Sequence, residues 1–571
     1  MMKAGRILLE MLKKYEVDTI FGLPGETTLH LYEEWKSFPD IRHVMVRDER
    51  SSAFMAHGYA KISGKPGICE SPSPGSTHLV PGLLEAQKSA IPLLAFTSDI
   101  PLHMEKRNML TGFDQPDLLR SVVKETMDIT RPEDIPFFIR RAFRVATTGR
   151  PGPVHLRLPM DMLEMSADPD DLYAQREFSR CPGLRSCADA EQVRAAVDLL
   201  EKAEKGFLIC GQGAVTSGAW EAVTAIAEQF GLAVGTSIGG KGAISELHPL
   251  SVGVVGARGG TSFSNGILAD ADLVFFVGSS TDSAGTAGWT LPPRKGKAKV
   301  IQLDVSEAEL GNNYASDVLL LGDARATLEA LLAEAARRQL PSRRSRGEEL
   351  RHLGERYRES CAAGLLCNDT PVHPMRFVCA LSSFLSDDAP VVVDPGISAI
   401  YPATYLRLGR PGRRFVCNFA IGALGFGLPA AIGAAFAAPG SPVTALSGDG
   451  SFGFCAAEME TLARTKANVK LFLFDNRGFG WIRATNFFEF GTSEHFSTDF
   501  DATDYCRVAE GFGLRTARIA TPQDLESTLR AVYAEPGPVF VEVKALPEDQ
   551  CVPPVPGWAR RSAEKGISTF Y

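Results

Sequence analysis

The sequence predicts an α/β protein with three doubly wound parallel-sheet domains. Short apolar strands alternate with helical patterns along most of the chain, which is typical of parallel sheets covered by helices on both faces. Two polar or highly charged stretches, 168–188 and 337–358, interrupt this alternation. They divide the chain into segments 1–165, 189–337 and 365–545, followed by a tail at 546–571 that is rich in proline and charge.

Each segment contains runs of the length and apolar character that strands require. The expected strands are 19–21, 43–46, 93–97 and 154–158 in the first segment, 206–210, 273–277 and 299–303 in the second, and 391–393, 443–447, 469–475 and 539–543 in the third. Helices are expected at 4–15, 51–63, 82–89 and 456–464. The segments share this order of elements without a residue-level repeat, so we expect three similar domains rather than a solenoid.

Composition excludes several classes of function. The 571 residues carry a formal net charge of −8 and no lysine- or arginine-rich block, so we expect no nucleic-acid partner. The 11 cysteines are scattered without a C-x-x-C pair, which argues against a disulfide framework or a zinc site. Without a run of about 18 apolar residues or a signal-peptide pattern, the chain is expected to be cytoplasmic and to lack a membrane span.

Two oxygen-bearing side chains follow neighbouring strands of the third segment. Asp449 ends the strand 443–447, and Asn476 ends the strand 469–475 one crossover later. Ligands bind at the carboxyl ends of strands in such sheets, so the two side chains can converge on one cation. Gly448 and Gly450 let the backbone approach a phosphate closely. Oxygen ligands of this kind suit Mg²⁺ together with phosphate and water.

This pattern of Gly-Asp-Gly-Ser and a following Asn resembles the diphosphate-binding signature of thiamine-diphosphate-dependent enzymes. The resemblance implies that Asp449, Asn476 and the carbonyl of Gly478 bind Mg²⁺, and that Gly448, Gly450 and Ser451 bind the cofactor. A Gly-Asp-Gly turn alone usually binds nothing. Its pairing with the Asn one strand later favours the site.

Residues 47–61 resemble the motif of the same family that contacts the cofactor's pyrimidine ring. The resemblance implies that Glu49 shares a proton with that ring and activates the cofactor. An isolated glutamate here would instead be a charge at a helix N-terminus. Residues 21–26 resemble a family turn, and residues 73–78 with 82–86 resemble a family loop and the helix after it. His78 stands where the family usually has Asn. His78 is either a site residue or a packed polar side chain.

Residues 421–431 resemble the loop that bends the cofactor into a V shape. The resemblance implies that Leu424 is the apolar wedge, where acetolactate synthases usually have Met, and that the carbonyl of Gly422 accepts a hydrogen bond from the ring amino group. Without the motif, Leu424 would be assigned to the core. Gly396 is assigned to the same cofactor site.

The resemblance covers nearly the whole chain. It makes 1–165 the pyrimidine-binding domain, 189–337 a central domain and 365–545 the diphosphate-binding domain. In such relatives the activating Glu and the metal ligands belong to different subunits, so we expect a homodimer or homotetramer with composite active sites. The tail 546–571 is expected to be disordered or to lie over another subunit, and it could supply Trp558 or Phe570 as a lid.

Several reactions stay open for such an enzyme. The overall pattern favours a carboligase similar to acetolactate synthases, in which the acceptor-side residue is Gln115 shifted along its loop or is replaced by Thr111. The alternative is a simple 2-oxo acid decarboxylase that releases an aldehyde, with Glu26 as its acid. Glu26 could equally be a charge at a helix N-terminus. Ile482 stands where pyruvate decarboxylases have a second Glu, which counts against that alternative.

Two further alternatives are less favoured. The turn 211–214 resembles a dinucleotide-binding turn, and Arg258 could meet a phosphate of FAD or ADP, but the third glycine of the G-x-G-x-x-G fingerprint is missing. An FAD-linked oxidase is therefore not preferred. A homologue that binds the cofactor without catalysis is disfavoured because Glu49, Asp449 and Asn476 are all present.

The residues after Asn476 are expected to form the substrate pocket, namely Phe479, Trp481 and Ile482. Trp481 stands where acetolactate synthases have Met, and it could instead pack in an interface. We predict decarboxylation of a 2-oxo acid that depends on thiamine diphosphate and Mg²⁺, with transfer of the resulting enamine to a carbonyl acceptor.

Overall fold

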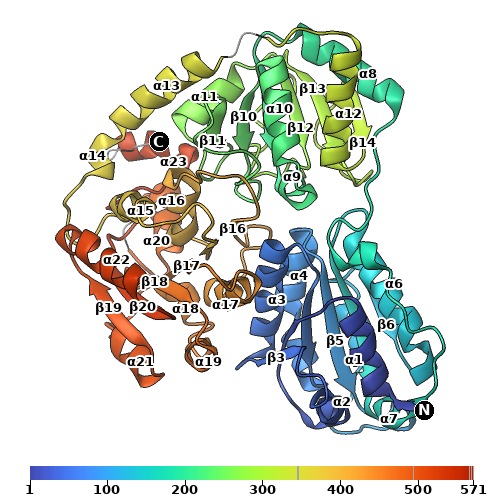
Figure 1. The fold of residues 1–571 in the computed structure, drawn as a ribbon. Helices are drawn as coiled ribbons and strands as arrows, with labels where there is room; N and C mark the ends of the chain where they lie inside the picture. Colours follow the sequence, from blue (N-terminus) through green and yellow to red (C-terminus); the bar gives the residue numbers. More distant parts are fainter. Residues whose placement is uncertain (344–345, 493, 549, 565, 567–568, 570–571) are drawn as a thin grey trace.

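The computed structural model describes residues 1–343, 346–492, 494–548, 550–564, 566 and 569 (Figure 1). It contains three six-stranded sheets, and every strand pair within them is parallel. The predicted α/β architecture of three doubly wound domains is confirmed. The described residues contain no helix long and apolar enough to cross a bilayer.

The N-terminal domain has the strand order β3-β2-β4-β5-β7-β6. Its strands are β2 (Thr19–Gly22), β3 (Arg42–Met45), β4 (Gly67–Ser71), β5 (Leu93–Asp99), β6 (Glu125–Asp128) and β7 (Pro153–Pro159). Its helices are α1 (Ala4–Lys14), α2 (Leu29–Trp35), α3 (Glu49–Ser63), α4 (Val80–Lys88), α5 (Gln115–Leu119), α6 (Ile135–Thr147) and α7 (Met160–Glu164). A short antiparallel pair, β1 (Met2–Lys3) with β8 (Ser166–Ala167), joins its two ends.

The central domain has the order β11-β10-β9-β12-β13-β14. Its strands are β9 (Gly206–Cys210), β10 (Ala233–Thr236), β11 (Ser251–Val254), β12 (Leu273–Val277), β13 (Lys299–Asp304) and β14 (Val318–Leu321). Its helices are α8 (Ala190–Lys202), α9 (Gln212–Ser217), α10 (Trp220–Phe230), α11 (Ser262–Ala269) and α12 (Ala324–Arg337). The charged connection that follows forms α13 (Gly347–Ser360) and α14 (Ala362–Leu365).

The C-terminal domain has the order β16-β15-β17-β18-β20-β19. Its strands are β15 (Val391–Val393), β16 (Phe415–Val416), β17 (Val443–Gly448), β18 (Val469–Asp475), β19 (Arg515–Ile519) and β20 (Val539–Lys544). Its helices are α15 (Pro374–Ser382), α16 (Ile397–Tyr405), α17 (Gly427–Ala437), α18 (Asp449–Phe452), α19 (Glu458–Thr465), α20 (Gly480–Thr485), α21 (Tyr505–Gly511), α22 (Leu525–Ala534) and α23 (Pro556–Glu564).

The strand orders locate the ligand-binding edges. Numbered in chain order, the outer two sheets share the order 2-1-3-4-6-5, and the central sheet has 3-2-1-4-5-6. The direction of winding reverses between β2 and β4, between β9 and β12, and between β15 and β17. Ligands of doubly wound folds bind at the carboxyl ends of strands at such a switch point. Each domain therefore offers one crevice at a position fixed by topology.

Helices α3 and α17 join the N-terminal and C-terminal domains (Figure 1). Glycines allow the two backbones to approach closely, since a Cβ at Gly58 would lie 2.0 Å from the carbonyl oxygen of Ala430. A Cβ at Gly433 would lie 1.9 Å from the carbonyl oxygen of Met55. One hydrophobic core includes buried residues from both domains, so their relative position is fixed by packing.

The described part of the tail is folded. Trp558 in α23 is buried against Phe488 and Trp481, with ring centroids 5.1 Å apart in both pairs. The sequence-based expectation of disorder is therefore wrong for 550–564, because aromatic burial attaches this helix to its own chain. The alternative expectation, that the tail lies over another subunit, stays a prediction. Phe570, the other aromatic residue considered for a lid, lies outside the described residues.

Candidate cofactor site

A cavity of about 400 Å³ lies at the switch point of the C-terminal domain, between β15 and β17. The residues that follow β15, β17 and β18 line it, together with the loop before α17. The structure brings every site residue predicted for this domain to the cavity: Gly396, Gly422, Leu424, Gly448, Asp449, Gly450, Ser451, Asn476, Gly478, Phe479, Trp481 and Ile482.

Asp449 is the first residue of α18 and is buried. Its carboxylate accepts hydrogen bonds from the backbone N–H of Gly450 at 2.8 Å and of Gly478 at 3.2 Å. Burial, with the nearby charge of Asp475, raises the pKa of Asp449 to about 7. A carboxylate in such an environment is stabilised by a bound cation. The donor set and its surroundings thus fit a divalent metal.

Asn476 is held by a residue that the sequence did not single out. Its Nδ2 donates to both carboxylate oxygens of Glu548 at 2.8 Å. Glu548 comes from the segment after β20, is buried and lines the cavity. Burial raises the pKa of Glu548 to about 8. No local motif marks this glutamate, since it is one acid in a charged tail.

Three glycines leave open space along the cavity. A Cβ at Gly396, Gly422 or Gly448 would meet no atom within 4 Å. Gly396 and Gly422 have φ values of 104° and 71°, which a residue with a Cβ rarely adopts. Close by, the buried Oδ1 of Asn418 has no hydrogen-bond partner among the described residues. The backbone is therefore shaped to admit a ligand with polar groups, as a diphosphate cofactor would be.

The loop that carries Leu424 is fixed on both sides. Ser451 Oγ accepts a hydrogen bond from the N–H of Gly425 at 2.8 Å, and Asp394 accepts one from the N–H of Phe426 at 3.0 Å. At its other end, the carboxylate of Glu85 in α4 accepts from the N–H groups of residues 420 and 421 at 3.2 and 3.0 Å. A buried glutamate of the N-terminal domain thus holds the loop of the C-terminal domain that carries Leu424.

Replacing Glu85 by Ala is expected to loosen this loop and weaken cofactor binding about 10-fold, because hydrogen bonds to a charged group contribute about 1.5–3 kcal/mol. Glu85→Gln, which keeps one acceptor, should have a smaller effect. Calorimetric titration with thiamine diphosphate and Mg²⁺ measures both. An unchanged affinity in a folded Glu85→Ala variant would show that the loop holds its position without Glu85.

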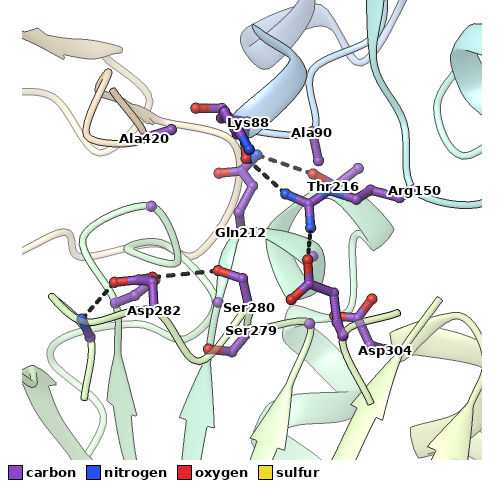
Figure 2. A pocket seen from close by; sticks show the side chains of 18 of the residues that line it. Lys88, Ala90, Arg150, Gln212, Thr216, Ser279, Ser280, Asp282, Asp304 and Ala420 are labelled. Carbon is purple, nitrogen blue, oxygen red and sulfur yellow. Dashed lines mark hydrogen bonds and ion pairs between the residues drawn. The ribbon is translucent and has the colours of Figure 1, made fainter. Parts of the chain in front are cut away.

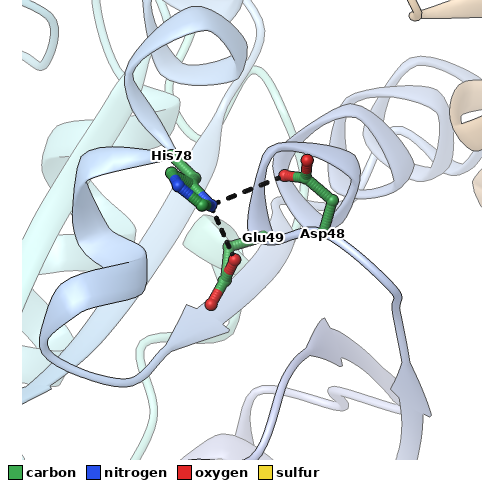
Figure 3. Close-up of side chains that lie close together, drawn as sticks. All are labelled: Asp48, Glu49 and His78. Carbon is green, nitrogen blue, oxygen red and sulfur yellow. Dashed lines mark hydrogen bonds and ion pairs between the residues drawn. The ribbon is translucent and has the colours of Figure 1, made fainter. Parts of the chain in front are cut away.

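Glu49 begins α3 at the crevice of the N-terminal domain. Its Oε2 lies 3.0 Å from Nδ1 of His78, and Oδ1 of Asp48 lies 3.8 Å from the same nitrogen (Figure 3). A Cβ at Gly75 would lie 2.3 Å from the other carboxylate oxygen, so the loop needs glycine there. On one protomer the His78 side chain is 58% exposed, whereas the Glu49 side chain is buried. Glu49 is not among the described residues that line the C-terminal cavity.

The two remaining predicted site residues differ in environment. Glu26 is exposed at the start of the short 3-10 helix Glu26–Thr28 that follows β2. Gln115 is fully buried, and its Nε2 donates to Ser73 Oγ and to the carbonyl of Ser98, each at 3.1 Å. This geometry gives Gln115 a role in holding the loop after β4. Neither residue lines the 400 Å³ cavity within the described chain.

A second cavity, of about 660 Å³, lies at the switch point of the central domain (Figure 2). The predicted turn at 211–214 contributes Gly211, Gln212 and Gly213 to its wall. Arg150 crosses part of this space and pairs with Glu309 (Figure 2). Arg258 lines both cavities. A nucleotide at this place remains a sequence-based alternative.

Family models for thiamine pyrophosphate enzymes match three parts of the chain. The N-terminal TPP binding domain matches residues 2–118, the central domain matches 193–331, and the C-terminal TPP binding domain matches 394–543. The chain belongs to the thiamine pyrophosphate enzyme family. The matched C-terminal residues include the cavity built around Asp449 and Asn476. Thiamine diphosphate is therefore the cofactor that this family member is built to bind.

Curated relatives match over nearly their full length. The chain is 30% identical over 576 residues to the acetolactate synthase of Arthrospira platensis, covering 98% of this chain and 97% of the relative. It is 29% identical over 570 residues to the probable acetolactate synthase large subunit of Methanocaldococcus jannaschii, with 98% and 94% covered. It is 28% identical over 563 residues to the isozyme 1 large subunit of Escherichia coli (strain K12), with 98% and 97% covered. This thiamine pyrophosphate enzyme is thus of the acetolactate synthase type.

Proposed function

We propose that the protein is a carboligase that decarboxylates a 2-oxo acid with thiamine diphosphate and Mg²⁺ and transfers the remaining acyl unit to a carbonyl acceptor. The observation that carries this proposal is the full-length similarity to acetolactate synthases combined with a cofactor cavity of matching chemistry. When bound, thiamine diphosphate supplies the carbon nucleophile for the 2-oxo group and takes up the electrons released with CO₂.

The residues of the chain would bind and position this cofactor. Asp449, Asn476 and the carbonyl of Gly478 would hold Mg²⁺, and Gly448 with Ser451 would accommodate the diphosphate at the strand ends. Leu424 would support the cofactor from its fixed loop. Glu49 would hold a proton at the pyrimidine ring. Because Glu49 lies outside this cavity on its own protomer, we propose that a second copy of the chain supplies it.

One cationic side chain that lines the cavity, Arg258, is relevant to the choice of acceptor substrate. Arg258 has no carboxylate within 4.0 Å in the described chain, and its guanidinium lies 5.1 Å above the ring centroid of Trp481. A cation that held the donor carboxylate would oppose its loss as CO₂, because it would stabilise the ground state. Arg258 is better suited to an acceptor that keeps its carboxylate, as a 2-oxo acid acceptor would.

Arg258→Gln is therefore expected to lower kcat/KM for carboxylated acceptors about 10- to 100-fold and to leave uncharged aldehyde acceptors nearly unaffected. Both acceptors compete in one assay that measures chiral hydroxyketone products and CO₂ release. Equal losses for both acceptors would contradict the assignment of Arg258.

The same assay tests the proposed function. The purified protein, with thiamine diphosphate and Mg²⁺, is given a panel of 2-oxo acids with and without acceptors. Release of CO₂ with hydroxyketone products supports the carboligase. Release of CO₂ with only free aldehyde would replace it by the simple decarboxylase. Turnover only after FAD is added would favour the oxidase.

A further inference from the structure

We infer that Glu548, from the segment after the last strand, is a positioning residue for the metal site: it orients the Asn476 side chain so that Oδ1 faces the cation. This inference rests on the proposed Mg²⁺ site of Asp449, Asn476 and Gly478. It assigns to the C-terminal segment a part in cofactor binding that neither the domain matches nor the sequence motifs cover.

The orientation follows from donor and acceptor chemistry. In the charged form that the hydrogen bond from Asn476 favours, the carboxylate of Glu548 only accepts hydrogen bonds, whereas an amide has one donating nitrogen and one accepting oxygen. Both oxygens of Glu548 lie 2.8 Å from Nδ2 of Asn476, so the amide nitrogen is committed to this contact. The amide oxygen is then directed away from Glu548. Partners of this kind, behind a ligand, commonly set its orientation and its metal affinity.

The surroundings hold Glu548 in place. It is 2% exposed, and a Cβ at Gly480 would lie 1.8 Å from its Oε1, so α20 must begin with glycine beside it. The backbone of Asn476 is fixed independently, because Arg483 Nη1 donates to its carbonyl oxygen at 3.0 Å. Main chain and side chain of Asn476 are thus held by different residues, and only the side-chain orientation depends on Glu548.

The test measures direct binding of Mn²⁺, in place of Mg²⁺, to the whole protein in the presence of thiamine diphosphate. The electron paramagnetic resonance signal of free Mn²⁺ reports how much of the metal stays unbound. Glu548→Gln is expected to weaken Mn²⁺ binding about 10- to 100-fold, because the glutamine can present either an oxygen or a nitrogen to Asn476. Gly480→Ala should do the same by displacing an unaltered Glu548.

The matched controls are Glu526→Gln on the exposed face of α22 and Gly511→Ala, where a Cβ meets nothing within 4 Å.

A double-mutant cycle separates orientation from direct ligation. An aspartate at 476 offers two equivalent oxygens and needs no orienting partner, so in the Asn476→Asp background Glu548→Gln should no longer weaken Mn²⁺ binding. Weakening of equal size in both backgrounds would make Glu548 a metal ligand and overturn the inference. Unchanged binding in both the folded Glu548→Gln and Gly480→Ala proteins would also overturn it. If the unmodified protein binds no Mn²⁺ with the cofactor, the proposed metal site itself fails and the inference fails with it.

Discussion

Replacing Glu49 by Gln is expected to reduce CO₂ release from every accepted 2-oxo acid by about 10²- to 10⁴-fold, the range for removal of a group that holds a proton in the transition state. The amide has nearly the same shape and can still contact His78, so folding should be unaffected. Glutamine cannot hold the proton that a carboxylate holds at the pyrimidine ring. The measurement is the steady-state rate at saturating cofactor.

Two controls keep this result specific. Glu33→Gln removes an exposed acid from α2 of the same domain and should leave the rate unchanged. Calorimetric titration should show that Glu49→Gln still binds thiamine diphosphate, because the diphosphate site is intact. A variant that retains more than about a tenth of the wild-type rate would remove Glu49 from the catalytic machinery.

Replacing Asp449 by Ala is expected to weaken binding of thiamine diphosphate with Mg²⁺ by about 100-fold or more, because a charged metal ligand is lost. In the absence of metal the same change should cost little stability, since burial already opposes the charged form of this carboxylate. Cofactor and Mg²⁺ should therefore raise the Tm of the unmodified protein and leave that of Asp449→Ala unchanged. Asp501→Ala, an exposed change in the same domain, is the control.

An equal Tm increase in Asp449→Ala and in the unmodified protein would contradict the metal assignment. A loss of stability without ligand would have a different meaning. It would show that Asp449 holds its loop through the N–H groups of Gly450 and Gly478 rather than through a cation.

The sequence predicts the buried centre of each sheet better than its edges. The fully buried β12, Leu273–Val277, is a continuous apolar run whose bounds match the prediction. The edge strand β19, Arg515–Ile519, contains two arginines and a threonine and has no regular apolar alternation, and β16 spans only two residues. Neither strand can be predicted from its own residues. Each is stabilised by pairing with a neighbouring strand, and its own composition contributes little.

The residues of the candidate site also differ in how well the sequence predicts them. Residues in local motifs at strand ends, such as Asp449 and Asn476, are predicted because topology alone brings strand ends together. Glu548 and Glu85 act on the same cavity from far along the chain. Glu548 lies in no recognised motif, and the helical run 82–86 that contains Glu85 resembles the family without indicating this contact. Their roles depend on tertiary contacts, so no spacing rule could have identified them.

The central claim is that Glu49 of one protomer and Asp449 of another form each active site, and complementation between inactive variants tests it most directly. Glu49→Gln and Asp449→Ala proteins are dissociated, mixed in equal amounts and reassociated. In a mixed dimer one of the two composite sites would contain both native residues, so activity should return to at most about one quarter of the wild-type rate. If the mixture stays as inactive as each variant alone, although mixed dimers are shown to form, each active site lies within a single protomer and the account is contradicted.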